Sequence, residues 1–146
     1  MIPDFSESGN LPPGMHSAVW DELETRYGGT PRRRILLQGL REGLKALQAA
    51  GCQRAYIDGS FVTEKLNPND FDVCWDAVGV QGGLLDPVLL DMAHPRTGQK
   101  SKFGGEFFLA NARATPRGTL YIDFFQQDKR TGDPKGIIEL DLGGLP

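Results

Sequence analysis

The spacing of apolar residues marks one long helix most clearly. Four leucines recur at intervals of four, four and three residues and so form one apolar face: Leu36, Leu40, Leu44 and Leu47. Thr30 is a typical N-cap, and Pro31 is favoured at the first helical position. Gly51 is a typical residue just beyond a helix end. The pattern therefore predicts a helix over residues 31–50.

Shorter apolar segments predict the other elements. Strands are expected over residues 54–58, 70–75, 106–111, 120–126 and 137–142, and further helices over residues 17–27, 61–66 and 84–92. Residues 1–16 are rich in proline and glycine and predict an extended arm, while residues 94–105 predict a mobile surface loop. We therefore expect an α/β (α+β) fold, a mixed β-sheet with helices packed on one face, in a single domain over residues 1–146.

The segment 70–75 places two acids on one side of a strand. Side chains alternate along a strand, so Asp70 and Asp72 share one face while Phe71, Val73 and Trp75 share the other. Two carboxylates on one strand face repel each other unless a cation lies between them. Because carboxylate oxygens suit hard cations, the pair indicates a divalent metal such as Mg²⁺.

The same acids belong to a longer motif. Gly59-Ser60 follows an apolar strand, and Asp70-Phe71-Asp72 comes after nine intervening residues. This arrangement resembles the signature of the DNA polymerase β-like nucleotidyltransferase superfamily. The sequence around this motif resembles small stand-alone prokaryotic proteins of the minimal nucleotidyltransferase type, and so do residues 2–5, 9–14 and 134–139.

The resemblance implies a fold, an activity and a cofactor. The fold would be a minimal nucleotidyltransferase core, and the activity would be transfer of a nucleoside monophosphate from an NTP to an acceptor hydroxyl, with Mg²⁺ or Mn²⁺ as cofactor. Small members of this superfamily often act in toxin-antitoxin or defence pairs, which implies a protein or tRNA acceptor and a partner protein. The chain has no room for the second, acceptor-binding domain of larger relatives.

A third metal-binding acid is expected on a later strand, as in the family pattern. Asp123 lies between Ile122 and Phe124 in the predicted strand 120–126. A carboxylate inside an apolar strand is costly unless it is paired or binds a metal. Asp123 is therefore our predicted third catalytic and metal ligand beside Asp70 and Asp72, and a purely structural acid is the alternative.

The phosphates of the nucleotide have three predicted contacts. A Gly-Ser turn before a helix presents free N–H groups to an anion, so Gly59 and Ser60 are predicted to bind phosphate; an ordinary turn is the alternative. Lys65 is the third contact, unless it is simply an exposed lysine.

Asp58 is either a fourth site acid or a turn-stabilising residue. Arg32 begins a basic cluster of three arginines, which is either a solvated helix start or a phosphate or partner contact.

Composition limits the classes of function and the compartment that the protein can have. The net charge of -3 and the pI near 5.3 argue against non-specific nucleic-acid binding, so no stable DNA binding is expected. The two cysteines, Cys52 and Cys74, give no disulfide framework, and no segment is apolar enough to span a membrane, so we expect a cytoplasmic protein. The alternative to an enzyme is a catalytically silent nucleotide-binding or partner-binding module on the same fold.

Overall fold

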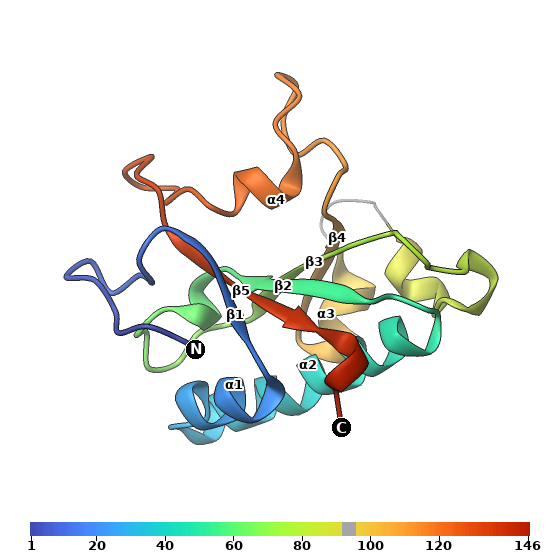
Figure 1. The fold of residues 1–146 in the computed structure, drawn as a ribbon, viewed down its shortest axis with the longest axis horizontal. Helices are drawn as coiled ribbons and strands as arrows, with labels where there is room; N and C mark the ends of the chain where they lie inside the picture. The colour runs from blue at the N-terminus through green and yellow to red at the C-terminus, as the bar shows by residue number, and fades with distance from the viewer. Residues whose placement is uncertain (92–95) are drawn as a thin grey trace.

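A mixed five-stranded sheet forms the centre of the computed structural model, which describes residues 1–91 and 96–146 (Figure 1). Its strands are β1 (Gly14–Ala18), β2 (Arg54–Asp58), β3 (Phe71–Trp75), β4 (Gly105–Leu109) and β5 (Gly136–Asp141), in the order β1-β5-β2-β3-β4. β2 runs antiparallel to both neighbours, β5 and β3, whereas β1 is parallel to β5 and β4 is parallel to β3. The predicted α+β class with a mixed sheet is confirmed.

Three helices lie on one side of this sheet. α1 (Trp20–Tyr27) and α2 (Pro31–Ala49) lie side by side beneath it, and α3 (Thr97–Phe103) lies near β4 at the sheet edge (Figure 1). α2 begins as predicted, because the Thr30 side chain accepts a hydrogen bond from the Arg33 N–H. All four leucines of the predicted stripe are buried against the sheet.

Alternation along the strands separates the core from a polar face. Ile57, Val73 and Phe107 point into the helix-covered core. On the opposite face, Asp58, Asp72 and Glu106 lie in register on β2, β3 and β4. Farther along the same face a second apolar cluster contains Cys74, Phe108, Ala110 and Phe125. Asp72 therefore lies on the face of the sheet that α1 and α2 do not cover.

The prediction of a strand over residues 120–126 is wrong. The segment instead forms the short helix α4 (Tyr121–Phe124), on the face of the sheet opposite α1 and α2 (Figure 1). Tyr121 and Phe125 are four residues apart and both contact the Phe108 ring, which a helical turn allows and a strand does not. The segment is apolar or aromatic except at Asp123 and Gln126, a pattern that fits both periods, so the alternation of Asp123 with its neighbours did not identify a strand.

Other boundaries also differ from the sequence expectations. The helix predicted over 84–92 is two 3₁₀ turns, Gly82–Leu84 and Pro87–Leu90, and Met92 lies outside the described residues. The loop predicted over 94–105 contains α3, with residues 94 and 95 outside the described part. The N-terminal arm ends in β1, an edge strand that the sequence did not indicate. The turn after β2 is the 3₁₀ helix Ser60–Val62 rather than a helix over 61–66.

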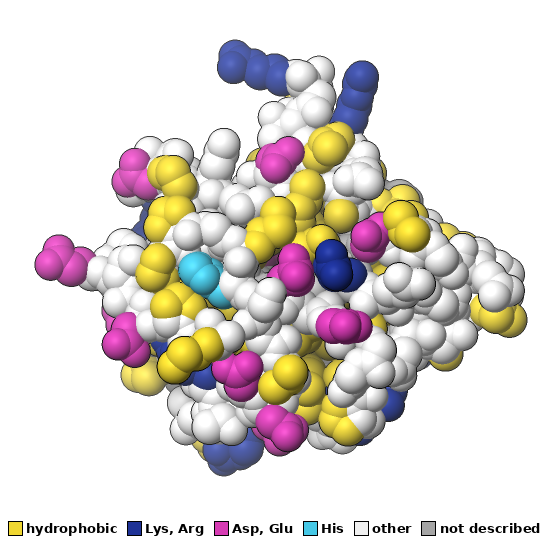
Figure 2. Space-filling view, in the orientation of Figure 1, with side chains coloured by type: hydrophobic (Ala, Val, Ile, Leu, Met, Phe, Trp, Pro, Cys, Tyr) yellow, Lys and Arg dark blue, Asp and Glu magenta, His cyan; other side chains and the backbone are white. Residues whose placement is uncertain are grey.

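The segment between β4 and α4 projects from the body of the protein. Figure 2 shows Lys and Arg side chains extending from the tip that this segment forms in Figure 1. It contains Arg113 and Arg117, both exposed. Among the helices that the structure describes, none is both long and apolar enough to cross a membrane.

Candidate active site

The Gly-Ser turn begins where β2 ends, and it depends on glycine. Gly59 has φ +78° and ψ -166°, a conformation that L side chains rarely adopt. A Cβ atom at this position would also collide with the Asp72 carboxylate. Gly59 therefore brings the backbone against Asp72, and the 3₁₀ turn starting at Ser60 follows directly.

Arg33 fixes the loop that joins the Gly-Ser turn to the acids. Its guanidinium is buried and donates hydrogen bonds to the backbone carbonyls of Phe61 at 2.7 Å, Thr63 at 2.9 Å and Lys65 at 3.1 Å. The neighbouring Arg32 donates to the Pro68 carbonyl at 3.2 Å. The alternative of a solvated helix start is therefore wrong for Arg33, whereas Arg32 is exposed and also binds this loop.

Acidic side chains from adjacent strands meet at one end of the sheet. Asp58 on β2 pairs in register with Asp72 on β3, and Asp72 pairs in register with Glu106 on β4. Asp70 lies immediately before β3 and alternates onto the same face as Asp72. Glu106 was not predicted, although it is a single acid in an apolar strand, the same signal that drew attention to Asp123.

Burial and the charges of neighbouring acids raise the pKa values of two of these acids, Asp72 and Asp58. Burial, followed by the charges of Asp70 and Glu106, raises the pKa of Asp72 to about 7. Burial, followed by the charge of Asp72, raises the pKa of Asp58 well above its usual range. Apart from the weak Cys74 thiol donor, the buried Asp58 carboxylate oxygens have no hydrogen-bond partner. Asp58 therefore does not act as a hydrogen-bonded turn stabiliser, and the neighbouring Cys74 side chain is buried.

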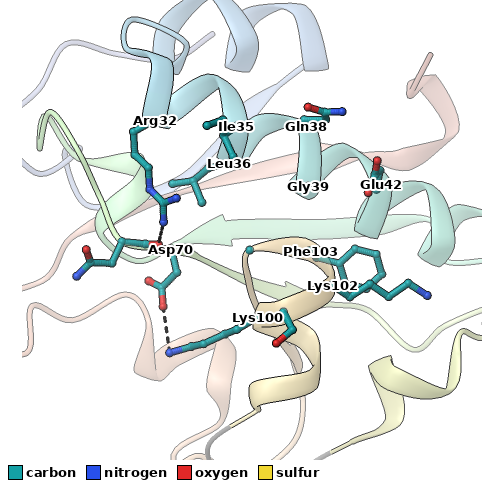
Figure 3. Close-up of a pocket in the computed structure, with 13 residues that line it drawn as sticks. Arg32, Ile35, Leu36, Gln38, Gly39, Glu42, Asp70, Lys100, Lys102 and Phe103 are labelled. Carbon is teal, nitrogen blue, oxygen red and sulfur yellow. Dashed lines mark hydrogen bonds and ion pairs between the residues drawn. The ribbon is translucent and has the colours of Figure 1, made fainter.

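Lys100 is the cation that pairs with this acidic cluster. Its Nζ atom lies 3.3 Å from Asp70 Oδ2 and 3.3 Å from Glu106 Oε1. Figure 3 shows Lys100 reaching toward Asp70 from α3, beside a groove of about 480 Å³ between α2 and α3. Among the described residues, no group of three or more His, Cys, Asp or Glu side chains is arranged to hold a metal ion. In this arrangement Lys100 bridges two of the acids instead.

A cleft of about 620 Å³ collects most of the predicted site residues. Gly59, Ser60, Lys65, Asp70 and Asp72 all line it. The segment after α4 supplies a basic side to the same cleft, which sequence reasoning missed: Lys129, Arg130 and Lys135. These residues carried no recognisable motif, because only the chain's return to β5 brings them opposite the Gly-Ser turn.

Asp123 is the predicted site residue that the structure does not bring to the cleft. It is exposed on α4 and is absent from the residues that line the cleft, although its neighbours Phe124 and Phe125 are among them. The geometric basis for Asp123 as the third acid was its place on a strand, and that strand does not form. Glu106 lies beside Asp72 on a neighbouring strand, although it too is absent from the residues that line the cleft.

Comparisons with known proteins identify a family without naming an activity. No curated protein and no solved structure matches the chain. One family model, described as a family of unknown function (DUF6932), matches residues 3–141, which is nearly the whole sequence. The chain therefore belongs to the DUF6932 family.

Proposed function

We propose that the protein is a metal-dependent nucleotidyltransferase, which moves a nucleoside monophosphate from an NTP to an acceptor hydroxyl. One observation carries the proposal: a single cleft contains the Gly59-Ser60 turn, the acids Asp70 and Asp72, and a basic side. Phosphates need donors and cations, and a metal needs carboxylates, so this combination suits a metal-bound triphosphate. The resemblance of the Gly-Ser and Asp-x-Asp spacing to the polymerase β-like signature supports the same assignment.

The acid cluster suits a hard divalent cation such as Mg²⁺ or Mn²⁺. Asp70, Asp72 and Glu106 offer oxygen ligands from β3, the residue before it and β4, and burial together with their mutual repulsion raises the pKa of Asp72 to about 7. A bound cation would relieve that repulsion and supply Lewis-acid stabilisation of the charge that develops on the phosphates. In this proposal Glu106 takes the role that the sequence suggested for Asp123.

The basic side of the cleft would hold the triphosphate. Lys129 and Lys135 lie near enough to Asp72 to lower its pKa, against the larger effect of burial. They are therefore placed to neutralise phosphate groups next to the acids. Ser60 can donate its hydroxyl from the opposite side, and Lys65 adds a further exposed cation at the rim.

The transfer step needs a positioned acceptor and a bound triphosphate. The acceptor oxygen would attack the α-phosphorus and form a new P–O bond. The bond from the α-phosphorus to the bridging oxygen would break, and pyrophosphate would leave with the electron pair. The acceptor proton would pass to solvent water. Ser60 and the lysines stabilise charge and orient the phosphates, which is most of what this chemistry requires.

A protein side chain or a tRNA is the acceptor that we propose, following the resemblance to small toxin-antitoxin and defence proteins. A partner protein would then supply the acceptor or control the site. The cytoplasm, where NTPs and Mg²⁺ are plentiful, is the compartment that fits this activity. Both cysteines are free thiols, as a reducing compartment favours.

A catalytically silent nucleotide-binding or partner-binding module is the second candidate function. Lys100 favours it, because this lysine already neutralises Asp70 and Glu106. In such a module the phosphates would bind at the basic side of the cleft without transfer, and divalent cations would have little effect.

The test is transfer of label from α-³²P-labelled NTPs, with Mg²⁺ or Mn²⁺, to the protein itself, to total tRNA and to proteins from the source cell. We expect labelling by the wild type and a loss of more than about 100-fold in Asp72→Asn, because transition-state charge is no longer held. Asp21→Asn, an exposed acid on α1, is the control and should keep full activity.

Binding measurements separate the two candidates. NTP binding measured by calorimetry, without any transfer in any of the three assays, would select the silent module. If the wild type neither transfers nor binds nucleotide, the proposed function is wrong. A rise in melting temperature with NTP and cation, absent in Asp70→Asn/Asp72→Asn, would support the metal-dependent site.

A further inference from the structure

Lys100 bridges two carboxylates that come from different strands. Its Nζ atom is 3.3 Å from an oxygen of Asp70, which precedes β3, and 3.3 Å from an oxygen of Glu106 on β4. Among the ion pairs of the described residues, both that involve the acids of the cluster are made by Lys100. The ammonium group therefore lies in the space that these two carboxylates enclose.

A divalent cation held by the same carboxylates would need the same space. Mg²⁺ binds carboxylate oxygens at about 2.1 Å, closer than an ammonium group does. An ammonium and a metal ion between one pair of carboxylates would also repel each other strongly. Binding of the metal therefore requires the Lys100 side chain to leave.

The surroundings of Lys100 allow its side chain to leave while α3 stays in place. The Lys100 side chain is 42% exposed and borders the open groove between α2 and α3 (Figure 3). α3 is anchored by other residues: the Gln99 amide donates to the Val88 carbonyl at 3.1 Å, and Gln99 Oε1 accepts from the Phe107 N–H at 2.8 Å. Only rotations of a flexible side chain are needed to free the acids.

We propose that Lys100 is a displaceable counter-cation, which holds Asp70 and Glu106 together in the metal-free protein and competes with the divalent cation for them. This inference rests on the proposed function, because it assigns the cation to the same acids. Lys100 is a positioning residue in this scheme. It keeps two repelling carboxylates close together and sets a threshold of cation concentration for occupancy of the site.

Direct cation binding tests the competition. Binding of Mn²⁺ to the purified chain, in the absence of nucleotide, is measured by electron paramagnetic resonance for the wild type and for Lys100→Met. Methionine keeps the length of the side chain and removes its charge. We expect Lys100→Met to bind Mn²⁺ about tenfold more tightly, because the cation no longer displaces an ion-paired ammonium. Its melting temperature without cation should fall, and saturating Mn²⁺ should abolish that difference.

Lys102→Met is the matched control. Lys102 lies on the same helix but pairs with Asp86, away from the acid cluster. Its removal should leave Mn²⁺ affinity within about twofold of the wild type. Lys100→Gln provides a second neutral variant and should repeat the tightening.

The outcomes separate this inference from the proposed function. If Mn²⁺ affinity is unchanged or weakened in both neutral Lys100 variants, or if neither they nor the wild type bind Mn²⁺, the counter-cation role is wrong. Tighter binding in those variants without nucleotidyl transfer in any assay would support the counter-cation role and refute the enzyme. Transfer that depends on Asp72, with Mn²⁺ affinity independent of Lys100, would support the proposed enzyme and refute the counter-cation role.

Discussion

Asp58 and Asp72 lie directly opposite each other on the antiparallel strands β2 and β3. Burial raises the pKa of both, that of Asp72 from 3.8 to about 7. Between pH 3.8 and about pH 7 the folded protein binds more protons than the unfolded chain, so the free energy of unfolding falls as pH rises. A shift of about three pKa units corresponds to about 4 kcal/mol at full burial, and the partial exposure of Asp72 lowers this to roughly 2–3 kcal/mol.

We therefore predict that Asp58→Asn stabilises the metal-free protein at pH 8 by about 1–3 kcal/mol. The amide cannot ionise, so the variant avoids the cost of burying or protonating this carboxyl, and it can donate a hydrogen bond to Asp72. The gain should shrink toward pH 5, because the raised pKa values of both carboxyls favour their neutral forms as pH falls. Urea unfolding at the two pH values, with chelator present, measures the difference. A gain that instead grows at pH 5 would show that Asp58 is ionised and paired in the folded protein.

Gly59→Ala should damage the site more than its backbone strain alone requires. The new Cβ would enter the space of the Asp72 carboxylate, and φ of +78° adds strain of about 1–2 kcal/mol. Gly118→Ala is a matched control, because Gly118 has φ +92° but no atom within 4 Å of its would-be Cβ. We expect a larger loss of stability and a larger loss of nucleotide binding in Gly59→Ala. Equal losses in both variants would mean that the approach to Asp72 is unimportant.

The sequence predicted the elements that local signals define. α2 has a leucine stripe, an N-cap at Thr30 and a stop at Gly51, and its bounds agree with the prediction within one residue. β2 and β3 were found as short apolar segments, and the period of two along β3 placed Asp70 and Asp72 on one face. Gly59, Ser60, Asp70 and Asp72 followed from spacing within one continuous segment, and the structure brings them into one cleft.

Features that depend on distant segments were not predictable in this way. Asp123 and Glu106 carry the same local signal, an acid among apolar residues, and only sheet topology places Glu106 beside Asp72. Lys100 pairs with Asp70 through the packing of α3 against α2, which no local pattern encodes. β1 is an edge strand with exposed positions, so it lacks the apolar alternation that identifies buried strands.

Arg33 should be a stability determinant despite its charge. Its guanidinium satisfies three backbone carbonyls of the loop at 61–65 and also stacks near the rings of Tyr27 and Phe61. Arg33→Met should lower the free energy of unfolding by roughly 2–4 kcal/mol, because those buried carbonyls lose their donors. Arg34→Met is the control, since Arg34 is exposed and its side chain donates only to the Gly28 carbonyl among the described hydrogen bonds. Hydrogen exchange in the loop should rise in the first variant and not in the second.

Lys129 and Lys135 should govern nucleotide affinity. Both line the cleft near Asp72, and neither forms an ion pair among the described contacts. Lys129→Ala/Lys135→Ala should weaken NTP binding by about 10- to 100-fold and reduce its dependence on salt. Lys45→Ala, on α2 and outside the cleft, should leave affinity unchanged. Calorimetric titration at two salt concentrations distinguishes charge neutralisation from loss of fold.

Glu106 and Asp123 give opposite expectations for the identity of the third acid. Glu106 lies in register with Asp72, and its charge contributes to the raised pKa of Asp72, whereas Asp123 is exposed on α4 and away from the cleft lining. Glu106→Gln should therefore weaken Mn²⁺ binding by at least about tenfold and reduce nucleotidyl transfer by about 100-fold or more, while Asp123→Asn should leave both within about threefold. Glu106→Gln also removes one partner of Lys100, so its stability without cation is measured alongside to separate misfolding from ligand loss. If Asp123→Asn abolishes Mn²⁺ binding and Glu106→Gln does not, the metal is held on the α4 side of the cleft, and the register of β3 with β4 does not define the site.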